Sequence, residues 1–364
     1  MRILYFSDTH FITSSAEAVF IMKMADAWTR NGHGVEVFAH VRSGTAPEIH
    51  RYYGTNGRFS IRSYGHTRIP GAKRLLRMST AWRFARKVPS DLVYGRCLYA
   101  VSSAAAAGSP VVLEQHTPPD SRAKARLLRR LFRGAAFRRL VVITESLRAH
   151  YLERFADTLQ AHQVVAAHDG ADPMEALPPP PERERVQFGY VGSLLPGKGW
   201  ETVVALAHRF PQHDFHIVGG TEEEIARIRS RGVPENLRLH GHVPHQQIPE
   251  RLARFDVALL PPLERVVVSS GQDIARWMSP MKLFEYMAAG RPVIASGLPV
   301  IREVLTHGEN GWICPPGDLD AWGEAVRRLA GDPALRRRLA ERARADFLAN
   351  YTWEERARRV LAGL

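Results

Sequence analysis

Residues 279–305 read SPMKLFEYMAAGRPVIASGLPVIREVL, and this stretch says most about the fold of the second half of the chain. It predicts a short helix over about 281–289 that ends at Ala-Ala-Gly, a buried strand over 292–296, and a second helix that starts with a small residue and a proline. Such a helix–strand–helix unit is typical of an open α/β sheet. Glu285 lies early on the first helix, where its carboxylate can accept hydrogen bonds from two vicinal ribose hydroxyls. The alternative is that Glu285 is an ordinary solvated helix residue.

The same alternation of strand and helix continues on both sides of this stretch. Strands are predicted where a short run of β-branched and aromatic residues is bounded by turn residues. In the first half of the chain these runs are 2–7, 34–40, 59–64, 91–96, 110–116 and 139–144. In the second half they are 186–193, 214–220, 236–241 and 256–262, with helices over about 199–209 and 222–231. The pattern predicts parallel sheets, whose ligands bind at the carboxyl ends of the strands.

The first helix is predicted over about 14–30. Ser14 is its expected N-cap, and Glu17 is spaced to complete a capping box by reaching back to that residue. Asn31-Gly32 predicts the end of the helix.

A proline-rich segment divides the chain. Residues 174–183, MEALPPPPER, break every periodicity, because consecutive prolines lack a backbone donor and hold an extended conformation. A length of 364 residues also exceeds what one hydrophobic core usually organises. We therefore predict an N-terminal domain over 1–173, a linker over 174–184 and a C-terminal domain over 185–349.

The composition is that of a folded protein in a reducing compartment. Apolar residues make up 45% of the chain and charged residues 24%, which are ordinary globular values. Its two cysteines, Cys97 and Cys314, lie far apart and lack metal-ligand spacing. Residues 1–15 lack the uninterrupted apolar core of a signal peptide, and no run of about 18 apolar residues could span a bilayer. These features predict a cytoplasmic protein, at most peripheral on the inner face of the membrane.

The net charge of +13 is concentrated in two segments of the first half, 68–87 and 122–139. Together they hold 15 lysines and arginines and no acidic residue, which leaves 50 − 15 = 35 basic against 37 acidic residues elsewhere. Leucine, tryptophan and phenylalanine stand between these charges, as in amphipathic helices. The segments are consistent with an anionic membrane surface or a phosphate-bearing acceptor, with a solvated helix face, or with nucleic acid. We expect no nucleic acid, because no nucleic-acid-binding signature accompanies the charge.

Glycines and one lysine follow the predicted strands of the second half. Gly192-Ser193 and Gly219-Gly220 close two strands, and Lys198-Gly199 opens a helix. Small residues at these places let backbone N–H groups and a helix N-terminus approach a pyrophosphate, while the lysine adds a cation. Each feature alone is common in α/β proteins.

Taken together, these segments resemble the retaining GT-B glycosyltransferases of the family 4 type. The matching residues are Gly192 with Lys198-Gly199, Val218-Gly219-Gly220, His240-Gly241-His242-Val243-Pro244, Phe284 to Gly290 with Pro292 to Ala295, and Glu309-Asn310-Gly311-Trp312 with Pro316-Gly317-Asp318. The resemblance covers nearly the whole chain. It implies an α/β protein of the GT-B type, with two Rossmann-like parallel-sheet domains that face each other across a cleft.

The resemblance also implies roles for individual residues. Lys198 would contact the donor pyrophosphate and Glu285 the ribose, and His116, at a strand end, would lie beside the transferred sugar; we expect these three to be catalytic. The expected donor-binding residues are Gly192, Ser193, Lys198, Gly219, Gly220, Gly241, His242, Val243, Ser279, Pro280, Lys282, Leu283 and Glu285. The expected acceptor or phosphate loop is Ser14, Ser15 and Ala16, of which Ser14 and Ser15 stand where the family usually has Gly-Gly. The last helix, over about 350–364, would pack back onto the first domain.

Two departures from the family pattern leave the donor open. Trp277 stands eight positions before Glu285, where the family usually has a second glutamate that touches the sugar. Lys282 lies nearby and can compensate by meeting the pyrophosphate or an acidic group on the sugar. Ser193 replaces the arginine that usually follows the first glycine.

The predicted reaction is a retaining transfer of a sugar, from a UDP-sugar in preference to other nucleotide sugars, to a hydroxyl of a saccharide or lipid-linked acceptor. The resemblance places it in the synthesis of cell-surface polysaccharide or glycolipid. We expect no metal or other cofactor, since no Asp-x-Asp motif lies in a suitable loop. The alternatives are a nucleotide-sugar epimerase of the same fold and a basic nucleic-acid-binding protein. An NAD-dependent oxidoreductase is disfavoured, because no strand is followed by Gly-x-Gly-x-x-Gly.

Overall fold

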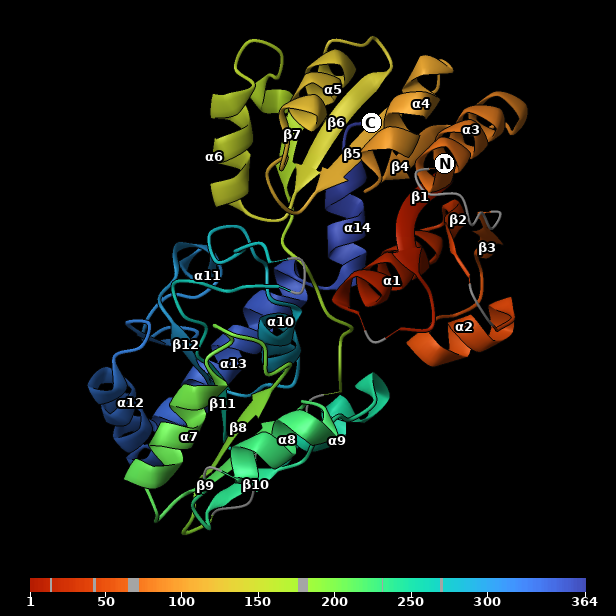
Figure 1. Ribbon diagram of the computed structural model, residues 1–364. Helices are drawn as coiled ribbons and strands as arrows, with labels where there is room; N and C mark the ends of the chain where they lie inside the picture. Colours follow the sequence, from red (N-terminus) through yellow and green to blue (C-terminus); the bar gives the residue numbers. More distant parts are fainter. Residues whose placement is uncertain (14, 42–43, 65–71, 176–182, 231, 269–270) are drawn as a thin grey trace. The chain divides into compact units, whose positions relative to one another are not determined.

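The computed structural model describes residues 1–13, 15–41, 44–64, 72–175, 183–230, 232–268 and 271–364 (Figure 1). The chain forms two compact units. One comprises Met1–His168 together with Trp353–Leu364, and the other comprises Asp169–Thr352. Each unit contains a parallel sheet covered by helices on both faces.

The first unit is built on a seven-stranded sheet in the order β3-β2-β1-β4-β5-β6-β7. Its strands are β1 (Arg2–His10), β2 (Gly34–His40), β3 (Ser60–Ser63), β4 (Leu92–Gly95), β5 (Val111–Gln115), β6 (Phe137–Val142) and β7 (Val164–Ala166). Its helices are α1 (Ala16–Arg30), α2 (Ala46–Tyr53), α3 (Ala72–Lys87), α4 (Leu98–Ala106), α5 (Arg122–Phe132), α6 (Glu145–Arg154), η1 (Ala161–Gln163) and α14 (Trp353–Leu361).

The strand order decides which face each helix covers. The chain moves outward from β1 to β3 and then returns to β4 on the other side of β1. Because such crossovers are right-handed, α1 and α2 cover one face, and the helices from α3 to α6 cover the other. Helix α14 packs on α1, although more than 300 residues separate them in the sequence.

The predicted start of the first helix is wrong by one residue. Ser15, not Ser14, is the N-cap of α1, and its hydroxyl accepts a hydrogen bond from the backbone N–H of Ala18 at 3.2 Å. Ser14 itself lies outside the described residues. The end of the helix agrees with the prediction, because Asn31 is its C-cap and Gly32 follows with φ of 85°.

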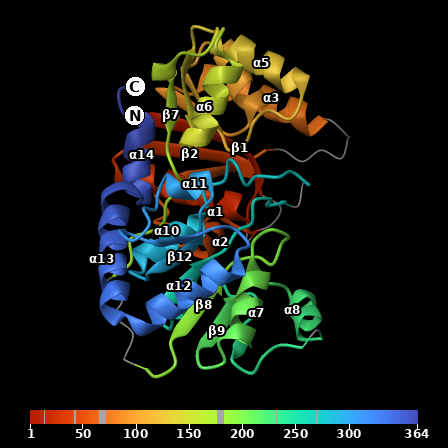
Figure 2. The same ribbon diagram turned by 90° about the vertical axis from the view of Figure 1, so that its left-hand side faces the viewer.

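The second unit is built on a six-stranded sheet in the order β10-β9-β8-β11-β12-β13. Its strands are β8 (Gln187–Val191), β9 (Asp214–Val218), β10 (Leu237–Leu239), β11 (Val257–Leu260), β12 (Val293–Ser296) and β13 (Trp312–Cys314). Its helices are α7 (Trp200–Arg209), α8 (Glu222–Arg229), η2 (His245–Gln247), α9 (Ile248–Leu252), α10 (Met281–Ala288), α11 (Pro299–Arg302), α12 (Leu319–Gly331) and α13 (Pro333–Asn350). Within this unit, α12 packs on α7 and α13 packs on α10 (Figure 2).

Helix α10 is held against β8 from one side and the core from the other. Leu283, Phe284 and Met287 are fully buried. Tyr286 is buried as well, and its hydroxyl accepts from the N–H of Val191 at 2.8 Å and donates to the carbonyl of the same residue at 3.3 Å. These contacts fix the helix that carries Lys282 and Glu285 relative to the end of β8.

The predicted α/β fold with two parallel sheets is confirmed. The structure divides the chain at His168/Asp169, whereas the domain boundary was predicted after 173; most of the predicted linker, 176–182, lies outside the described residues. The elements that were not predicted include α2, β7 and β13. β7 and β13 have three residues each, and neither lies within one of the longer runs predicted as strands. None of the described helices is long and apolar enough to cross a membrane.

Candidate functional site

The candidate site of the second unit lies where the order of its strands reverses. The chain runs from β8 outward to β10 and then returns to β11 on the other side of β8. The loops that follow β8 and β11 therefore diverge at the carboxyl edge of the sheet, which is where open α/β sheets generally bind their ligands. The predicted donor-binding residues come from these loops, from the ends of β9 and β10, and from the start of α10.

Glycines let the backbones of three strand ends approach one another closely. The N–H of Gly192 donates to the carbonyl of Val218 at 2.8 Å, and the N–H of Gly219 donates to the carbonyl of Gly241 at 2.7 Å. Gly219 has φ of 131°, and a Cβ atom there would lie only 2.0 Å from the carbonyl oxygen of Gly192. A side chain at Gly219 is therefore excluded by both conformation and space.

The loop after β8 leads to Lys198 and to the N-terminus of α7. Gly199 is the N-cap of α7 with φ of 80°, and a Cβ atom there would meet the carbonyl oxygen of Pro261 at 1.7 Å. The indole of Trp200 donates to the carbonyl of Leu194 at 3.0 Å. The loop is thus held at both ends, and Lys198 stands on a fixed backbone.

Two lysines approach each other at this edge. Burial, together with the nearby charge of Lys198, lowers the pKa of Lys282 to about 7, against the opposing effect of Glu285. Burial also lowers the pKa of Lys198. The ammonium of Lys282 lies 4.2 Å from the centre of the Tyr190 ring and against Gly192, where an added Cβ atom would meet it at 2.0 Å.

Neither lysine forms a salt bridge with a carboxylate among the described residues. The charge of Lys198 disfavours the charged form of Lys282, and an anion that contacted both lysines would favour it. Backbone N–H groups of the glycine-rich loop and of a helix N-terminus add to the preference for an anion. The arrangement suits a diphosphate.

Glu285 has a partner that the sequence analysis missed. Its Oε1 lies 2.8 Å from Nε2 of His245, and its side chain is only 14% exposed. His245 begins η2, one residue after the matched Val243-Pro244 segment. The sequence signal for His245 was its position directly after the matched segment, because a contact between residues 40 positions apart produces no periodic pattern.

The structure shows where the side chains of several predicted donor-binding residues lie. The hydroxyl of Ser279 accepts from the N–H of Asp169 at 2.9 Å and is buried, so that lone pair is already used inside the unit. Pro280 is the N-cap of α10 and provides no side-chain cap. Leu283 points into the core. His242 is exposed beside Gly241, at the end of β10.

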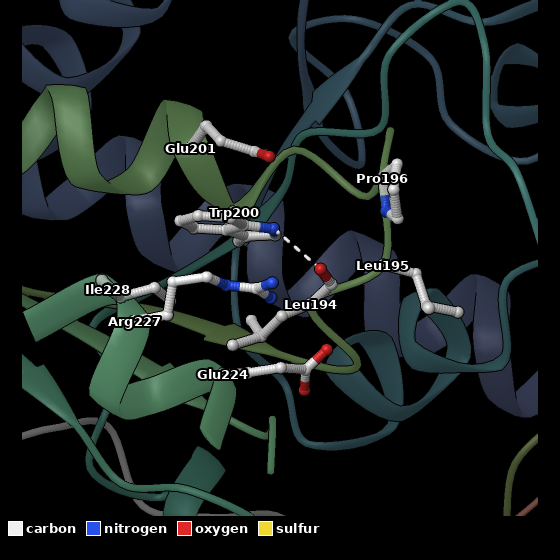
Figure 3. Close-up of a pocket in the computed structure, with 8 residues that line it drawn as sticks. All are labelled: Leu194, Leu195, Pro196, Trp200, Glu201, Glu224, Arg227 and Ile228. Atoms are coloured by element: carbon white, nitrogen blue, oxygen red, sulfur yellow. Dashed lines mark hydrogen bonds between the residues drawn. The ribbon is translucent and has the colours of Figure 1, made fainter. Parts of the chain in front are cut away.

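A separate cavity of about 370 Å³ opens beside the loop after β8 (Figure 3). Figure 3 shows the ring of Trp200 between the side chains of Glu201 and Arg227. Its lining residues are Leu194, Leu195, Pro196, Trp200, Glu201, Glu224, Arg227 and Ile228. Neither of the two lysines nor Glu285 lines it.

In the first unit, His116 follows β5 as predicted and is joined to a buried carboxylate. Its Nε2 lies 2.8 Å from Oε1 of Glu114. That oxygen also accepts from the guanidinium of Arg356 on α14 at 2.7 Å, and Tyr94 donates to the other carboxylate oxygen. Burial would raise the pKa of Glu114, but Arg356 and His116 hold it well below its ordinary value. Burial lowers the pKa of His116 to about 4.

The predicted acceptor loop is only partly described. Besides capping α1, the hydroxyl of Ser15 lies 3.1 Å from that of Thr13, and Ala16 begins the helix. In the described part of the chain, no three histidine, cysteine, aspartate or glutamate side chains are grouped so that they could hold a metal ion.

Two family models match the chain and together cover most of it. Residues 178–346 match the model described as glycosyl transferases group 1, and residues 18–175 match glycosyltransferase family 4. The chain belongs to the group 1 glycosyltransferases. Both models describe glycosyltransferases, and neither describes an epimerase or a nucleic-acid-binding protein.

Curated relatives of this group 1 glycosyltransferase match part of its length. It is 29% identical to the glycogen synthase of Mycobacterium tuberculosis over 174 residues, 45% of the chain and 39% of that protein. It is 32% identical to the phosphatidyl-myo-inositol mannosyltransferase of Mycobacterium leprae over 145 residues, 40% of the chain and 36% of that protein. The matches thus span less than half of either relative.

A solved structure matches the whole glycosyltransferase chain. The crystal structure of Anabaena HepE in complex with UDP superposes with a TM-score of 0.72 at 15% identity, covering 99% of this chain and 98% of that one. At this identity the likeness shows the fold alone, which is GT-B.

Proposed function

We propose that this enzyme transfers a sugar from a UDP-sugar, with retention of the anomeric configuration, to a hydroxyl of a saccharide or lipid-linked acceptor. The observation that carries the proposal is the pair Lys198 and Lys282 at the glycine-rich edge of the second sheet, with Glu285 on the same helix as Lys282. The pair supplies the charge for a diphosphate, and the carboxylate supplies acceptors for a ribose. HepE, which has the same fold, is described with UDP bound, and this supports uridine as the base.

The proposed reaction requires no covalent bond between the protein and the sugar. As the bond from the anomeric carbon to the diphosphate oxygen breaks, negative charge builds on the leaving phosphate. In this proposal Lys198, Lys282 and the N-terminus of α7 stabilise that charge. The leaving phosphate then accepts the proton of the acceptor hydroxyl, which attacks the same face of the sugar and so retains its configuration. No metal is needed in this scheme, since the two lysines supply the positive charge.

Individual roles follow from this reaction. Lys198 and Lys282 hold the diphosphate, and Glu285, oriented by His245, accepts from the ribose hydroxyls. The backbone of Gly241, His242 and Val243 contacts the uracil. The backbone around Gly192, Ser193, Gly219 and Gly220 approaches the phosphates. His116 in the first unit contacts the transferred sugar, and Ser15 and Ala16 contribute to the acceptor side.

The acceptor or its membrane is proposed to be anionic, because of the side chains on α3 and α5. These two helices lie on the same side of the first sheet (Figure 1, Figure 2). On α3, Leu75 is 64% and Trp82 45% exposed, and the guanidinium of Arg86 lies 4.8 Å from the Trp82 ring. Seven positions separate the two apolar residues, so they share one helix face.

Helix α5 presents mainly charge. Its apolar residues Leu128, Leu131 and Phe132 are buried, as in an amphipathic helix whose apolar face meets the core. Among its cations, Lys124, Arg129 and Arg133 form ion pairs with aspartates. Arg122, Arg126 and Arg130 follow at four-residue intervals, are exposed and have no ion pair among the described residues. We propose that α3 inserts into an anionic lipid surface and that Arg122, Arg126 and Arg130 of α5 face that surface. The described part of the basic segment 68–87 begins at residue 72.

A donor assay tests the proposed reaction. The enzyme is titrated with UDP, GDP and ADP in a calorimeter, and hydrolysis of UDP-glucose is followed by NMR. We expect UDP to bind most tightly and the first glucose released to be the α-anomer. Release of the β-anomer would contradict retention, and equal binding of all three nucleotides would contradict a uridine site. Glu285→Ala should weaken UDP binding, because the ribose loses its acceptor.

A further inference from the structure

A chain of buried polar contacts runs from the last helix of the first unit to His116. The guanidinium of Arg356 donates to Oε1 of Glu114 at 2.7 Å, and that oxygen lies 2.8 Å from Nε2 of His116. Arg356 is 2% exposed and Glu114 is 0% exposed. The family resemblance pointed to His116 alone and gave no role to Glu114 or Arg356.

The carboxylate of Glu114 determines where the hydrogen sits on the His116 ring. An ionised carboxylate accepts hydrogen bonds and cannot donate them, so the ring atom that contacts it, Nε2, must carry the hydrogen. Arg356 and the hydroxyl of Tyr94 both donate to the same carboxylate and favour its ionised form. The neutral ring then has a lone pair on Nδ1.

Nδ1 of His116 is left as an acceptor. None of the described residues donates a hydrogen bond to it, and the side chain is 17% exposed. Of the charged groups near His116, Arg96 and Arg356 oppose protonation of the ring, and Glu114 favours it. Arg356 lies beyond the carboxylate, and Arg96, which follows β4, is paired with Glu17 of α1 at 3.6 Å.

Aromatic packing fixes the plane of the ring. Phe20 of α1 meets His116 edge to face, with ring centres 5.0 Å apart at 90°. The guanidinium of Arg356 lies 4.6 Å from the centre of Phe20, and Trp353 packs on Phe20 from α14 with ring centres 5.5 Å apart. Helix α14 therefore positions His116 through two routes, the carboxylate and the phenyl ring.

We propose that Arg356 and Glu114 are positioning residues, which hold His116 as the neutral tautomer with hydrogen on Nε2 so that Nδ1 accepts a hydrogen bond from a hydroxyl of the transferred sugar. The inference rests on the proposed function for the identity of that hydroxyl, but the tautomer itself does not depend on it. A buried ion pair that only attaches α14 to the sheet would have the same contacts. The experiment must therefore read the state of the ring.

The tautomer is measured on full-length, ¹⁵N-labelled enzyme without substrate. Long-range ¹H–¹⁵N spectra separate the two neutral tautomers and the imidazolium, and the signals of His116 are assigned as those absent in His116→Gln. We expect the hydrogen on Nε2 and a neutral ring throughout pH 5.5 to 8. Hydrogen on Nδ1, or an imidazolium in that range, would overturn the proposal.

The variant Arg356→Met tests the positioning role. Without the guanidinium, the buried carboxylate keeps its charge by drawing a proton to His116, so the ring should become an imidazolium near neutral pH and lose its acceptor. We expect kcat for UDP-glucose hydrolysis to fall about tenfold, the upper end for one lost hydrogen bond, with the Kd for UDP unchanged. The acid limb of the pH profile should move to higher pH. An unchanged ring and pH profile would refute the role.

Two further variants separate this role from loss of structure. Arg356→Lys keeps a cation and should restore most of the neutral ring and of kcat. Arg358→Met removes the same charge from an exposed position of the same helix and should change neither. If Arg356→Met does not fold, the wild-type tautomer and the Arg356→Lys pH profile still decide. Absence of UDP binding by wild-type enzyme would refute the proposed function while leaving the tautomer result valid. If His116→Gln binds UDP and hydrolyses UDP-glucose as the wild type does, only the proposed contact of His116 with the sugar is refuted.

Discussion

Lys282 is the residue whose removal most directly tests the donor site. Its ammonium lies close to Lys198 and has no carboxylate partner within salt-bridge distance among the described residues. A bound diphosphate would supply that partner. A hydrogen bond to a charged group contributes about 2 kcal/mol, so Lys282→Met should weaken UDP binding about 30-fold. Helix α10 should stay folded, because its buried face is made by other residues.

The pH dependence of binding gives a second, independent number. The pKa of Lys282 is lowered to about 7 in the free enzyme, and a bound diphosphate would raise it again. Above pH 7 the free lysine loses its proton, so UDP must bind together with a proton. Each pH unit then costs about 1.4 kcal/mol, and affinity should fall about tenfold from pH 7.5 to 8.5. Below the pKa of the free lysine the charge is present before binding, and this dependence disappears.

Calorimetry measures both effects. Titrations with UDP at pH 7.5, 8.0 and 8.5, each in two buffers of different ionisation enthalpy, give the affinity and the number of protons taken up. We expect uptake that approaches one proton in the wild type and is much smaller in Lys282→Met. The control Lys124→Met removes the same charge from an exposed pair on α5 and should bind as the wild type does. Wild-type affinity in Lys282→Met, or binding without proton uptake at pH 8.5, would refute the reasoning.

Three other predictions concern other parts of the structure. Gly219→Ala should lower Tm by several degrees and abolish UDP binding, because backbone strain of about 1 to 3 kcal/mol adds to a contact of 2.0 Å between the new Cβ atom and a backbone oxygen. Calorimetric unfolding measures the change in Tm. The control is Gly232→Ala, which also replaces a positive-φ glycine but puts the Cβ atom into open space. The double variant Leu75→Ser and Trp82→Ser should leave Tm unchanged and reduce cosedimentation with phosphatidylglycerol vesicles at least tenfold. Neutral phosphatidylcholine vesicles should bind neither the wild type nor the variant. Equal binding of the wild type and the variant to phosphatidylglycerol vesicles would contradict insertion of α3. Treatment with a chelator should leave UDP-glucose hydrolysis intact, and loss of activity restored by Mg²⁺ or Mn²⁺ would show that the two lysines do not suffice.

Most of the two sheets could be predicted from the sequence, because their strands are apolar runs of four or more residues bounded by turn residues. β2 illustrates this, since its predicted and observed bounds agree. β7 and β13, of three residues each, were not predicted, whereas the equally short β10 was, because it lies within the longer run 236–241. The N-cap of α1 was misplaced because Ser14 and Ser15 are both competent caps, and only the backbone conformation at Ser15 decides between them.

The candidate site was predictable where it depends on the local sequence and not where it depends on distant contacts. Glycines after strands and a lysine before a helix are local signals. The contact of His245 with Glu285 and that of Arg356 with Glu114 join residues 40 and 242 positions apart. The lowered pKa of Lys282 likewise arises from burial and from Lys198, which only the folded structure brings near. No pattern in one sequence encodes these pairs.

Because α14 belongs to the first unit, that unit is synthesised first but can complete its fold only after the second unit has been synthesised. The ribosome finishes the second unit before residue 353 appears, and that unit is continuous in the chain. The first unit, made earlier, must wait with the carboxylate of Glu114 inside its sheet and no arginine to face it, and with Trp28 lacking the carbonyl of Ala357 to which its indole donates. A nascent chain released before α14 would carry a finished second unit and an incomplete first one. Truncation at the far end of the chain would thus damage the part that was synthesised first.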